Sequence, residues 1–535
     1  MLLPPRMPDL TTRPQGGIEP WLLRLLLAAS AAAALVFLFG AVQRCGYPHE
    51  LEWMEGALAD HAWRVANGLP LYCAPSPEHV PFLYAPLLFW LGGLGIAMGI
   101  DGIVALRLVA IASTLGCALL VGHWVRRETQ NVGVGLAASG TFLAGYGWLA
   151  WWYDLARNDT LFVVLVLATA YVLRHGGPRR WVGAAVLATL AVLAKQSALV
   201  WLPAIGVGAL LHDWRNALRF GIAAVLAGAA VFGLMHWTSD GWSTFFLFEM
   251  PQQHGIVGDR KLGFWTQDVL PMLPLVALGL VGCVAQMRAG RAREALFLAA
   301  FGSGALVTSW LLRMHVGGFD NVLMYGFAGA CVLGPIAAAN GRVLRCIWLA
   351  QFVWLGVVAM ERGTATWLPS AAHRHAHDEL AAFVARQGGS VWIPAHGHIS
   401  TRAGKGAGAH GQAVFDLLQQ LPKVEGIGMD LTVLHDPERM AQLPGRGGEA
   451  VRSLFSQAFA ALRERRFAAV VIDETGGTGQ FPYVFALGLL GADQQPGTTD
   501  DPYVRSPTPL LREPAAIRPL LGYETHSSYA LLPRQ

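Results

Sequence analysis

The sequence is poor in charge. Asp, Glu, Lys and Arg make up 14% of its 535 residues, whereas hydrophobic residues make up 54%. A soluble domain carries about 25% charged residues. The deficit falls in long apolar runs, so lipid is the solvent for most of this chain. The formal net charge of +4 is small and gives no signal for nucleic-acid binding.

Cysteine is also scarce, with six residues in the whole chain. Four of them lie in or beside apolar runs, where a thiol behaves as a small hydrophobic side chain. Cys45 and Cys73 fall in the first polar loop, where a disulfide is allowed if the loop faces the periplasm. Sequence does not fix the geometry that a disulfide needs, so this pairing stays open.

Signals for nucleotide or metal binding are weak. No internal repeat is visible, and the Gly-rich stretch 404–411 contains GKGAG without the spacing of a Walker phosphate loop. His396 and His398 form an H-x-H, which we interpret as part of a polar loop. The histidines at 373–377 are interpreted as a solvated linker. Neither group predicts a metal site.

What the sequence has instead is a series of apolar runs that continues to about residue 360. The first, Trp21 to Gln43, follows a short segment with Arg6 and Arg13. It is longer than the apolar core of a signal peptide and long enough to span, so we expect a retained first helix. We expect eleven spans, at residues 21–43, 103–125, 132–151, 159–174, 181–196, 197–211, 219–237, 267–287, 295–313, 321–339 and 343–360.

One further apolar segment, Phe82 to Ile100, decides the topology. It contains Pro86 and a Gly-Gly pair at 92–93, and it either crosses or lies at the interface. If it does not cross, five short loops share one side and carry many arginines and few carboxylates, which is typical of cytoplasmic loops. We therefore expect an outer juxtamembrane helix here, a cytoplasmic N-terminus and an extracytoplasmic C-terminus. The arginines are Arg126, Arg127, Arg174, Arg179, Arg180, Arg215, Arg219, Arg288, Arg291, Arg293, Arg342 and Arg345.

The tail after residue 360 changes character. It is richer in polar residues, Gly and Pro, and it has no 20-residue apolar run. Ser390 to Pro394 predicts a short strand, and Phe467 to Ile472 (FAAVVI) predicts a buried strand after a basic helical stretch, Leu462 to Arg466. The predicted parts are a cytoplasmic segment 1–20, a transmembrane domain 21–360 with an outer loop 44–102, and an extracytoplasmic α/β domain 361–535.

Two glutamates of the first outer loop form the sharpest candidate pair. Glu52 and Glu55 stand at i and i+3 in LEWMEG, and on a helix this spacing places both carboxylates on one face. A carboxylate beside apolar Trp53 and Met54 can have a raised pKa, which suits a general base that takes a proton from an acceptor hydroxyl or amine. The competing interpretation is two solvated glutamates on an amphipathic loop helix.

Cations on the same side are candidates for binding an anion. Lys195 closes the apolar run AVLAKQSALV, where a lysine is costly unless something pairs with it. A phosphate would pair with Lys195 or Arg157, and so would a nearby carboxylate; the residues leave both open. Arg313 is a further phosphate candidate, although arginines at helix ends commonly snorkel. The other candidates for a substrate site on this side are Tyr84, Asp154, Asp159, Gln196, His254, His315 and Asn321.

The segment LEWMEGALADHAWRVANGLPLY, from Leu51, resembles the first outer loop of bacterial GT-C glycosyltransferases of the dolichyl-phosphate-mannose-protein mannosyltransferase-like group. That loop often has an acidic residue, an aromatic, a variable residue and Glu-Gly, then a helix and Gly-x-x-x-Tyr. Here the first acid is Glu52, where Asp is expected, the second is Glu55, and the last motif runs from Gly68 to Tyr72.

Four later segments resemble the family in the same order along the chain. They are YAPLLFWL from Tyr84, with Ala85 in place of a proline; ARNDTLFVVL, with Arg157 and Asp159; AVLAKQSAL, with Lys195 and Gln196; and HVGGFDNVLM, with Asn321.

The resemblance covers about residues 20–360. It implies an all-α polytopic membrane bundle of the GT-C type, with about eleven transmembrane helices, outer juxtamembrane helices and a small C-terminal α/β domain. It also implies a hexosyl- or pentosyltransferase of the bacterial inner membrane, acting from a polyprenyl-phosphate sugar onto an outer glycan, lipid or protein. Glu52 or Glu55 would be the catalytic acid or base, and Lys195 and Arg157 would hold the lipid phosphate. Some relatives use a divalent metal and others none, so the metal requirement stays open.

Two other classes remain as alternatives. A lipid or sugar transporter or flippase would favour internal repeats and interrupted helices near the bilayer midplane, whereas the charges here gather on one face. A non-catalytic envelope assembly protein would place its function in the tail and tolerate replacement of the outer-loop glutamates.

Overall fold

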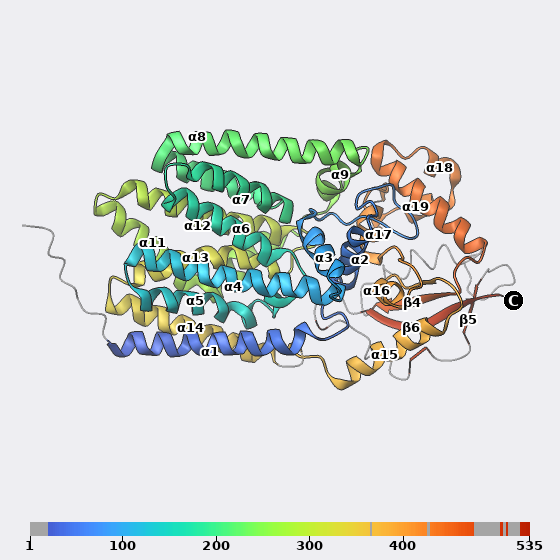
Figure 1. The fold of residues 1–535 in the computed structure, drawn as a ribbon, viewed down its shortest axis with the longest axis horizontal. Helices are drawn as coiled ribbons and strands as arrows, with labels where there is room; N and C mark the ends of the chain where they lie inside the picture. The colour runs from blue at the N-terminus through green and yellow to red at the C-terminus, as the bar shows by residue number, and fades with distance from the viewer. Residues whose placement is uncertain are drawn as a thin grey trace, which may run out of the picture.

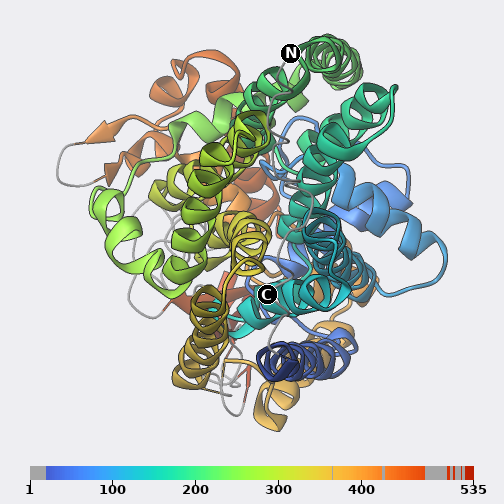
Figure 2. The same cartoon turned by 90° about the vertical axis from the view of Figure 1, so that its left-hand side faces the viewer.

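The computed structural model describes residues 20–363, 366–424, 428–475, 503–506, 510–511, 520 and 525–534. A bundle of long helices occupies one end of the molecule, and a mixed α/β region caps the other (Figure 1). The bundle is seen end-on in Figure 2. The first outer loop lies between the bundle and the α/β region (Figure 1).

Ten long helices build the bundle, and one of them is broken. Seven of them are long and apolar enough to cross a membrane by length and composition, if α11 and α13 are counted together with the short turns that precede them. The ten are α1 (Pro20–Cys45), α4 (Gly102–Thr129), α5 (Val132–Trp148), α6 (Asp159–His175), α7 (Arg180–Ala194), α8 (Ala198–Thr238), α11 (Leu273–Arg288), α12 (Ala292–Met314), α13 (Leu323–Ala338) and α14 (Arg342–Arg362).

The break in α8 accounts for the eleventh expected crossing. Asp213 has non-helical angles (φ −153°, ψ 90°), so the 41-residue α8 consists of two arms that match the expected spans 197–211 and 219–237. Lys195 is extended (φ −158°, ψ 124°) and separates α7 from α8, which confirms the division expected there. The predicted helical membrane bundle is therefore confirmed.

The segment 82–100 forms a short helix, α3 (Leu87–Ala97). Eleven residues extend about 16 Å, and the hydrocarbon core of a bilayer is about 30 Å thick. The helix therefore cannot cross, in line with its prediction as a juxtamembrane element. It packs beside α2 (Glu55–Ala66) at the end of the bundle that meets the α/β region (Figure 1).

Small residues let the bundle helices approach closely, as is common in membrane bundles. A Cβ added to Gly140 of α5 would lie 2.1 Å from Cβ of Ser30 in α1, and one added to Gly122 of α4 would lie 2.0 Å from Oγ of Ser139 in α5. The turn between α4 and α5 ends at Asn131, whose side chain accepts a hydrogen bond from the backbone N–H of Val134 and so caps α5. The small side chains at these contacts therefore set how closely α1, α4 and α5 pack.

The C-terminal region contains a four-stranded sheet in the order β1-β4-β6-β5, in which β1 and β4 are parallel and the other neighbours antiparallel. The strands expected at 390–394 and 467–472 correspond to β1 and β4. The elements are α15 (Ala371–Arg386), β1 (Val391–Trp392), α16 (Gly397–Arg402), α17 (Gly411–Leu418), β2 (Lys423–Val424), β3 (Gly428–Met429), α18 (Pro437–Ala441), α19 (Gly445–Arg463), β4 (Ala469–Thr475), β5 (Tyr503–Arg505) and β6 (Thr525–Pro533).

Two expectations about small groups are corrected. The histidines at 373–377 are not a linker, because Ser370 caps α15 there and His377 is fully buried in that helix. Cys45 and Cys73 are free thiols, so the disulfide left open for them is not formed in the structure.

Candidate active site

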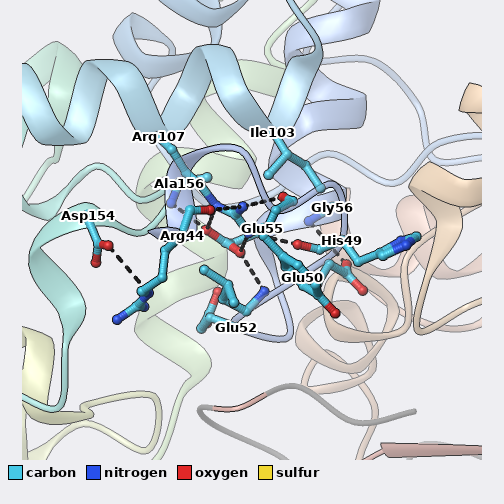
Figure 3. Close-up of polar contacts among 12 residues, drawn as sticks. Arg44, His49, Glu50, Glu52, Glu55, Gly56, Ile103, Arg107, Asp154 and Ala156 are labelled. Carbon is cyan, nitrogen blue, oxygen red and sulfur yellow. Dashed lines mark hydrogen bonds and ion pairs between the residues drawn. The ribbon is translucent and has the colours of Figure 1, made fainter. Parts of the chain in front are cut away.

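Glu55 is the anchor of the first outer loop. Its Oε1 accepts from Arg107 Nε (2.9 Å) and from the backbone N–H of Ala156 (2.7 Å). Its Oε2 accepts from Arg107 Nη2 (2.5 Å) and from the backbone N–H of Leu51 (2.7 Å) (Figure 3). A carboxylate has about four acceptor positions, and here all are occupied. Burial opposes ionisation, but Arg107 outweighs it and lowers the pKa of Glu55 below its ordinary value.

Glu52 faces a different cation. Helix α2 begins at Glu55, so Glu52 precedes the helix and the expectation of one shared helical face is wrong. The Glu52 side chain is fully buried, and its Oε1 lies 3.2 Å from Arg157 Nη1. Burial raises the pKa of Glu52 to about 8, and the charge of Arg157 limits the rise.

Arg157 is held between this carboxylate and aromatic rings. Its Nη2 donates to the hydroxyl of Tyr84 (2.9 Å). Its guanidinium carbon lies 5.2 Å from the centroid of the Tyr84 ring, 5.5 Å from Trp152 and 6.0 Å from Trp53. Cation–π contacts of this kind stabilise a desolvated arginine. The charge is therefore fixed in position before any ligand arrives.

Lys195 is held in a second polar group. Its Nζ donates to Asp159 Oδ1 (2.6 Å) and to the hydroxyl of Tyr325 (2.9 Å). Asn321 Nδ2 donates to the same oxygen of Asp159 (3.0 Å). In the structure Lys195 thus has the carboxylate partner that the sequence offered as an alternative to a phosphate.

These groups border one cavity of about 310 Å³ at the outer-loop end of the bundle. Helix ends, outer loops and α17 of the C-terminal region all contribute to it. Of the predicted site residues it brings together Tyr84, Arg157, Lys195, Gln196, His254, His315 and Asn321.

The other predicted site residues do not line this cavity. Glu52 and Asp159 lie behind the residues that line the cavity. Glu52 pairs with Arg157, and Asp159 pairs with Lys195. Asp154 pairs with Arg44 (3.3 Å) in support of the loop after α5 (Figure 3). Arg313 pairs with Asp268 (2.9 Å) in the segment before α11 and with Asp320 (3.3 Å) in the loop before α13, so it braces these loops.

The sequence interpretation missed two groups. Arg107, which holds Glu55, lies inside an apolar run, and a charge in a span is itself a signal of a buried partner. The second group is α17, whose Gln412, Asp416 and Gln419 recur at i, i+4 and i+7 on one helical face that lines the cavity. No resemblance covered this part of the chain, so its place in the site came only from the fold.

The H-x-H at residues 396–398 is not part of a polar loop, because it forms the start of α16, and this corrects its interpretation. His396 and His398 are buried, and their Nδ1 atoms lie 2.5 and 3.5 Å from the carboxylate of Glu50 in the first outer loop. Among the residues that the structure describes, no group of three or more His, Cys, Asp or Glu is placed to hold a metal ion. The metal requirement stays open.

No family model matches the chain. The "Putative multidrug resistance protein MdtD" of Salmonella newport and of Salmonella typhimurium is 32% identical over a match 122 residues long, and the match covers 19% of this chain and 26% of the relative. The chain thus spans about a quarter of the length of the curated relatives it matches. This likeness shows no family.

Solved structures give a likeness over most of the chain. Archaeal oligosaccharyltransferase AglB from Archaeoglobus fulgidus, in complex with an inhibitory peptide and a dolichol-phosphate, has a TM-score of 0.50 at 13% identity and covers 85% of this chain and 69% of that one. This chain has the GT-C fold. ArnT from Cupriavidus metallidurans in the apo state is similar at a TM-score of 0.48 and 16% identity, over 84% of this chain and 81% of that one. The likeness to AglB confirms the GT-C fold that the resemblance of the outer-loop motifs implied.

Proposed function

We propose that this membrane protein is a glycosyltransferase that moves a hexosyl or pentosyl group from a polyprenyl-phosphate donor to a glycan, lipid or protein acceptor. The observation that carries the proposal is the convergence of Arg157 and Lys195, from different segments, on one cavity at the end of a membrane bundle. The predicted orientation would place this end on the outer face of a bacterial inner membrane.

The surroundings of the cavity suit a lipid with an anionic head. A second hollow of about 350 Å³, lined by apolar and small residues, lies among α11, α12 and α13. On α12 the two hollows are separated by the stretch from Leu306 to Leu312, about 9 Å along the helix axis. A polyprenyl chain can lie against such a surface while its phosphate meets the two cations. AglB, whose fold this chain shares, is in complex with a dolichol-phosphate.

The cations would act on the leaving group. Attack of the acceptor on the anomeric carbon breaks the bond to the phosphate oxygen, and the electron pair leaves with the polyprenyl phosphate. Fixed positive charge at the place where negative charge develops lowers the barrier. Arg157 and Lys195 would hold that phosphate, and Arg313 would support the loop rather than touch the donor.

The glutamates then have supporting parts in the proposal. Glu55 has its acceptor positions filled and holds the loop to Arg107. Glu52 lies behind Arg157 and orients it. Their catalytic assignment from the resemblance stays a prediction.

The test is lipid binding by the purified full-length protein. Native mass spectrometry with undecaprenyl phosphate is expected to show a bound lipid that is lost in Arg157→Ala and Lys195→Ala. Lys261→Ala is the matched control, because Lys261 is an exposed cation of an outer loop. Equal binding by all four proteins, or binding by none while ordinary phospholipids are retained, would contradict the proposal and favour a transporter or an assembly protein.

A further inference from the structure

Helix α17 brings a carboxylate from the C-terminal region into the cavity. Asp416 is 3% exposed and lines the cavity together with Gln412, Phe415 and Gln419 of the same segment. Gln412 Nε2 donates to Asp416 Oδ1 (2.9 Å), and Gln412 Oε1 accepts from Trp53 Nε1 (3.3 Å). The carboxylate is therefore connected to the first outer loop through one glutamine.

Asp416 is the one carboxylate among the described residues that line the cavity. The other acids near the site are engaged elsewhere: Glu52 with Arg157, Glu55 with Arg107, and Asp159 with Lys195. No lysine or arginine of the described residues forms an ion pair with Asp416. Its nearest basic neighbour is His254, whose Nε2 lies 3.4 Å from Oδ1.

The electrostatic setting suits proton transfer near neutral pH. Burial raises the pKa of Asp416 to about 7, and the hydrogen bond from Gln412 limits the rise. Burial, together with the neighbouring His315, lowers the pKa of His254 to about 4, so His254 is neutral near pH 7. A general base works best when its pKa lies near the operating pH.

Asp416 also lies near the proposed phosphate site. Its negative charge helps to raise the pKa of Tyr84, after the larger effect of burial. The hydroxyl of Tyr84 accepts from Arg157 Nη2 at 2.9 Å. Asp416 and the cation that would hold the leaving phosphate thus border the same space.

We propose that Asp416 is the catalytic base that takes the proton from the acceptor. The inference rests on the proposed glycosyl transfer. The O–H or N–H bond of the acceptor breaks and its proton passes to the Asp416 carboxylate, while the acceptor atom bonds to the anomeric carbon. The bond from that carbon to the phosphate oxygen breaks, and the polyprenyl phosphate leaves with the electron pair beside Arg157 and Lys195. The C-terminal region is then part of the catalytic centre and shapes the acceptor side of the cavity.

The test uses water as the acceptor, because water must lose a proton to the same base. Full-length protein in detergent is given undecaprenyl-phosphoryl mannose, glucose, galactose or arabinose, and free sugar is measured from pH 5.5 to 8.5. Binding of undecaprenyl phosphate is measured separately. Asp416→Asn is expected to lower sugar release at least about 100-fold while binding is unchanged. Asp416→Glu is expected to retain part of the rate with a shifted pH profile, and Glu449→Gln, an exposed carboxylate of α19, serves as the control.

Each result decides between the two proposals. Wild-type release by Asp416→Asn would overturn the role of Asp416 and leave the donor proposal standing. Loss of lipid binding by that variant would also overturn the role of a base, because Asp416 would then be needed to bind the donor. If Glu52→Gln instead loses the pH-dependent part of the sugar-release profile, Glu52 is the base. Wild-type protein that binds the lipid but releases no sugar from any of the four donors would also overturn a base at this position. Failure to bind undecaprenyl phosphate would overturn the glycosyltransferase proposal itself.

Discussion

At the residue scale, the first outer loop depends on one buried arginine. Arg107 donates to Glu55 and to the backbone carbonyls of Arg44, Tyr47 and His49 (Figure 3). Neither partner of the Arg107–Glu55 pair is exposed. The pair therefore determines where the loop runs and where Glu52 and Trp53 sit.

Removing one side of that pair is expected to destabilise the fold. Glu55→Gln would leave the Arg107 guanidinium buried without its counter-charge, which costs about 3–5 kcal/mol. Thermal unfolding of the purified protein, followed by intrinsic tryptophan fluorescence, should show a clearly lower midpoint. Glu449→Gln, at an exposed ion pair, should unfold like the wild type. An unchanged midpoint in Glu55→Gln would contradict the anchoring role.

At the scale of elements, side-chain size sets how α1, α4 and α5 pack. Gly140 is the tightest contact between α1 and α5, with Ser30 Cα only 2.4 Å from the position of an added Cβ.

One added methyl group tests that packing. Gly140→Ala is expected to force α1 and α5 apart and to cost about 1–3 kcal/mol through overpacking. Gly228→Ala in α8 is the matched control, because nothing lies within 4 Å of its added Cβ. Equal thermal unfolding midpoints for the two variants would show that the close α1–α5 contact does not determine the stability of the fold.

At the scale of the whole molecule, a buried polar interface joins the first outer loop to the C-terminal region. Glu50 contacts His396 and His398, and His49 stacks on His377 with ring centroids 4.8 Å apart. Burial opposes ionisation of Glu50, but the two histidines outweigh it and lower its pKa, so it stays charged in mild acid. A further contact of the same loop reaches α17, where Gln412 Oε1 accepts from Trp53 Nε1 (3.3 Å).

That interface is expected to weaken in acid. Burial lowers the pKa of His49 to about 4, of His377 to about 3 and of His410 to about 4, from 6.5. Below pH 6.5 the unfolded chain binds protons that the folded one does not, so stability is lost as pH falls from 6.5 toward 4. At pH 5 the loss is about 2 kcal/mol per histidine.

The measurement is the thermal midpoint at pH 7.5 and at pH 5.0. We expect a lower midpoint at pH 5.0, and a smaller difference in His377→Leu, which lacks one titrating group. A midpoint that is equal or higher at pH 5.0 would contradict the assignment of these histidines as buried and neutral.

The sequence by itself determined the membrane bundle, since length and hydropathy in lipid leave a spanning segment few options other than a helix. It also determined the division at Lys195, because a charge ends an apolar run. Seven of its candidate residues came together because all of them lie in the segments that connect the helices at one end of the bundle.

Only the tertiary structure decided which partner each charge has. Glu52 and Glu55 are three residues apart, but the start of α2 between them turns one toward Arg157 and the other toward Arg107. Asp416 is 259 positions from Arg157 in the chain, and no local pattern encodes a contact at such a separation. Periodicity reports which face of a helix is buried, whereas the identity of the facing group depends on how distant segments pack.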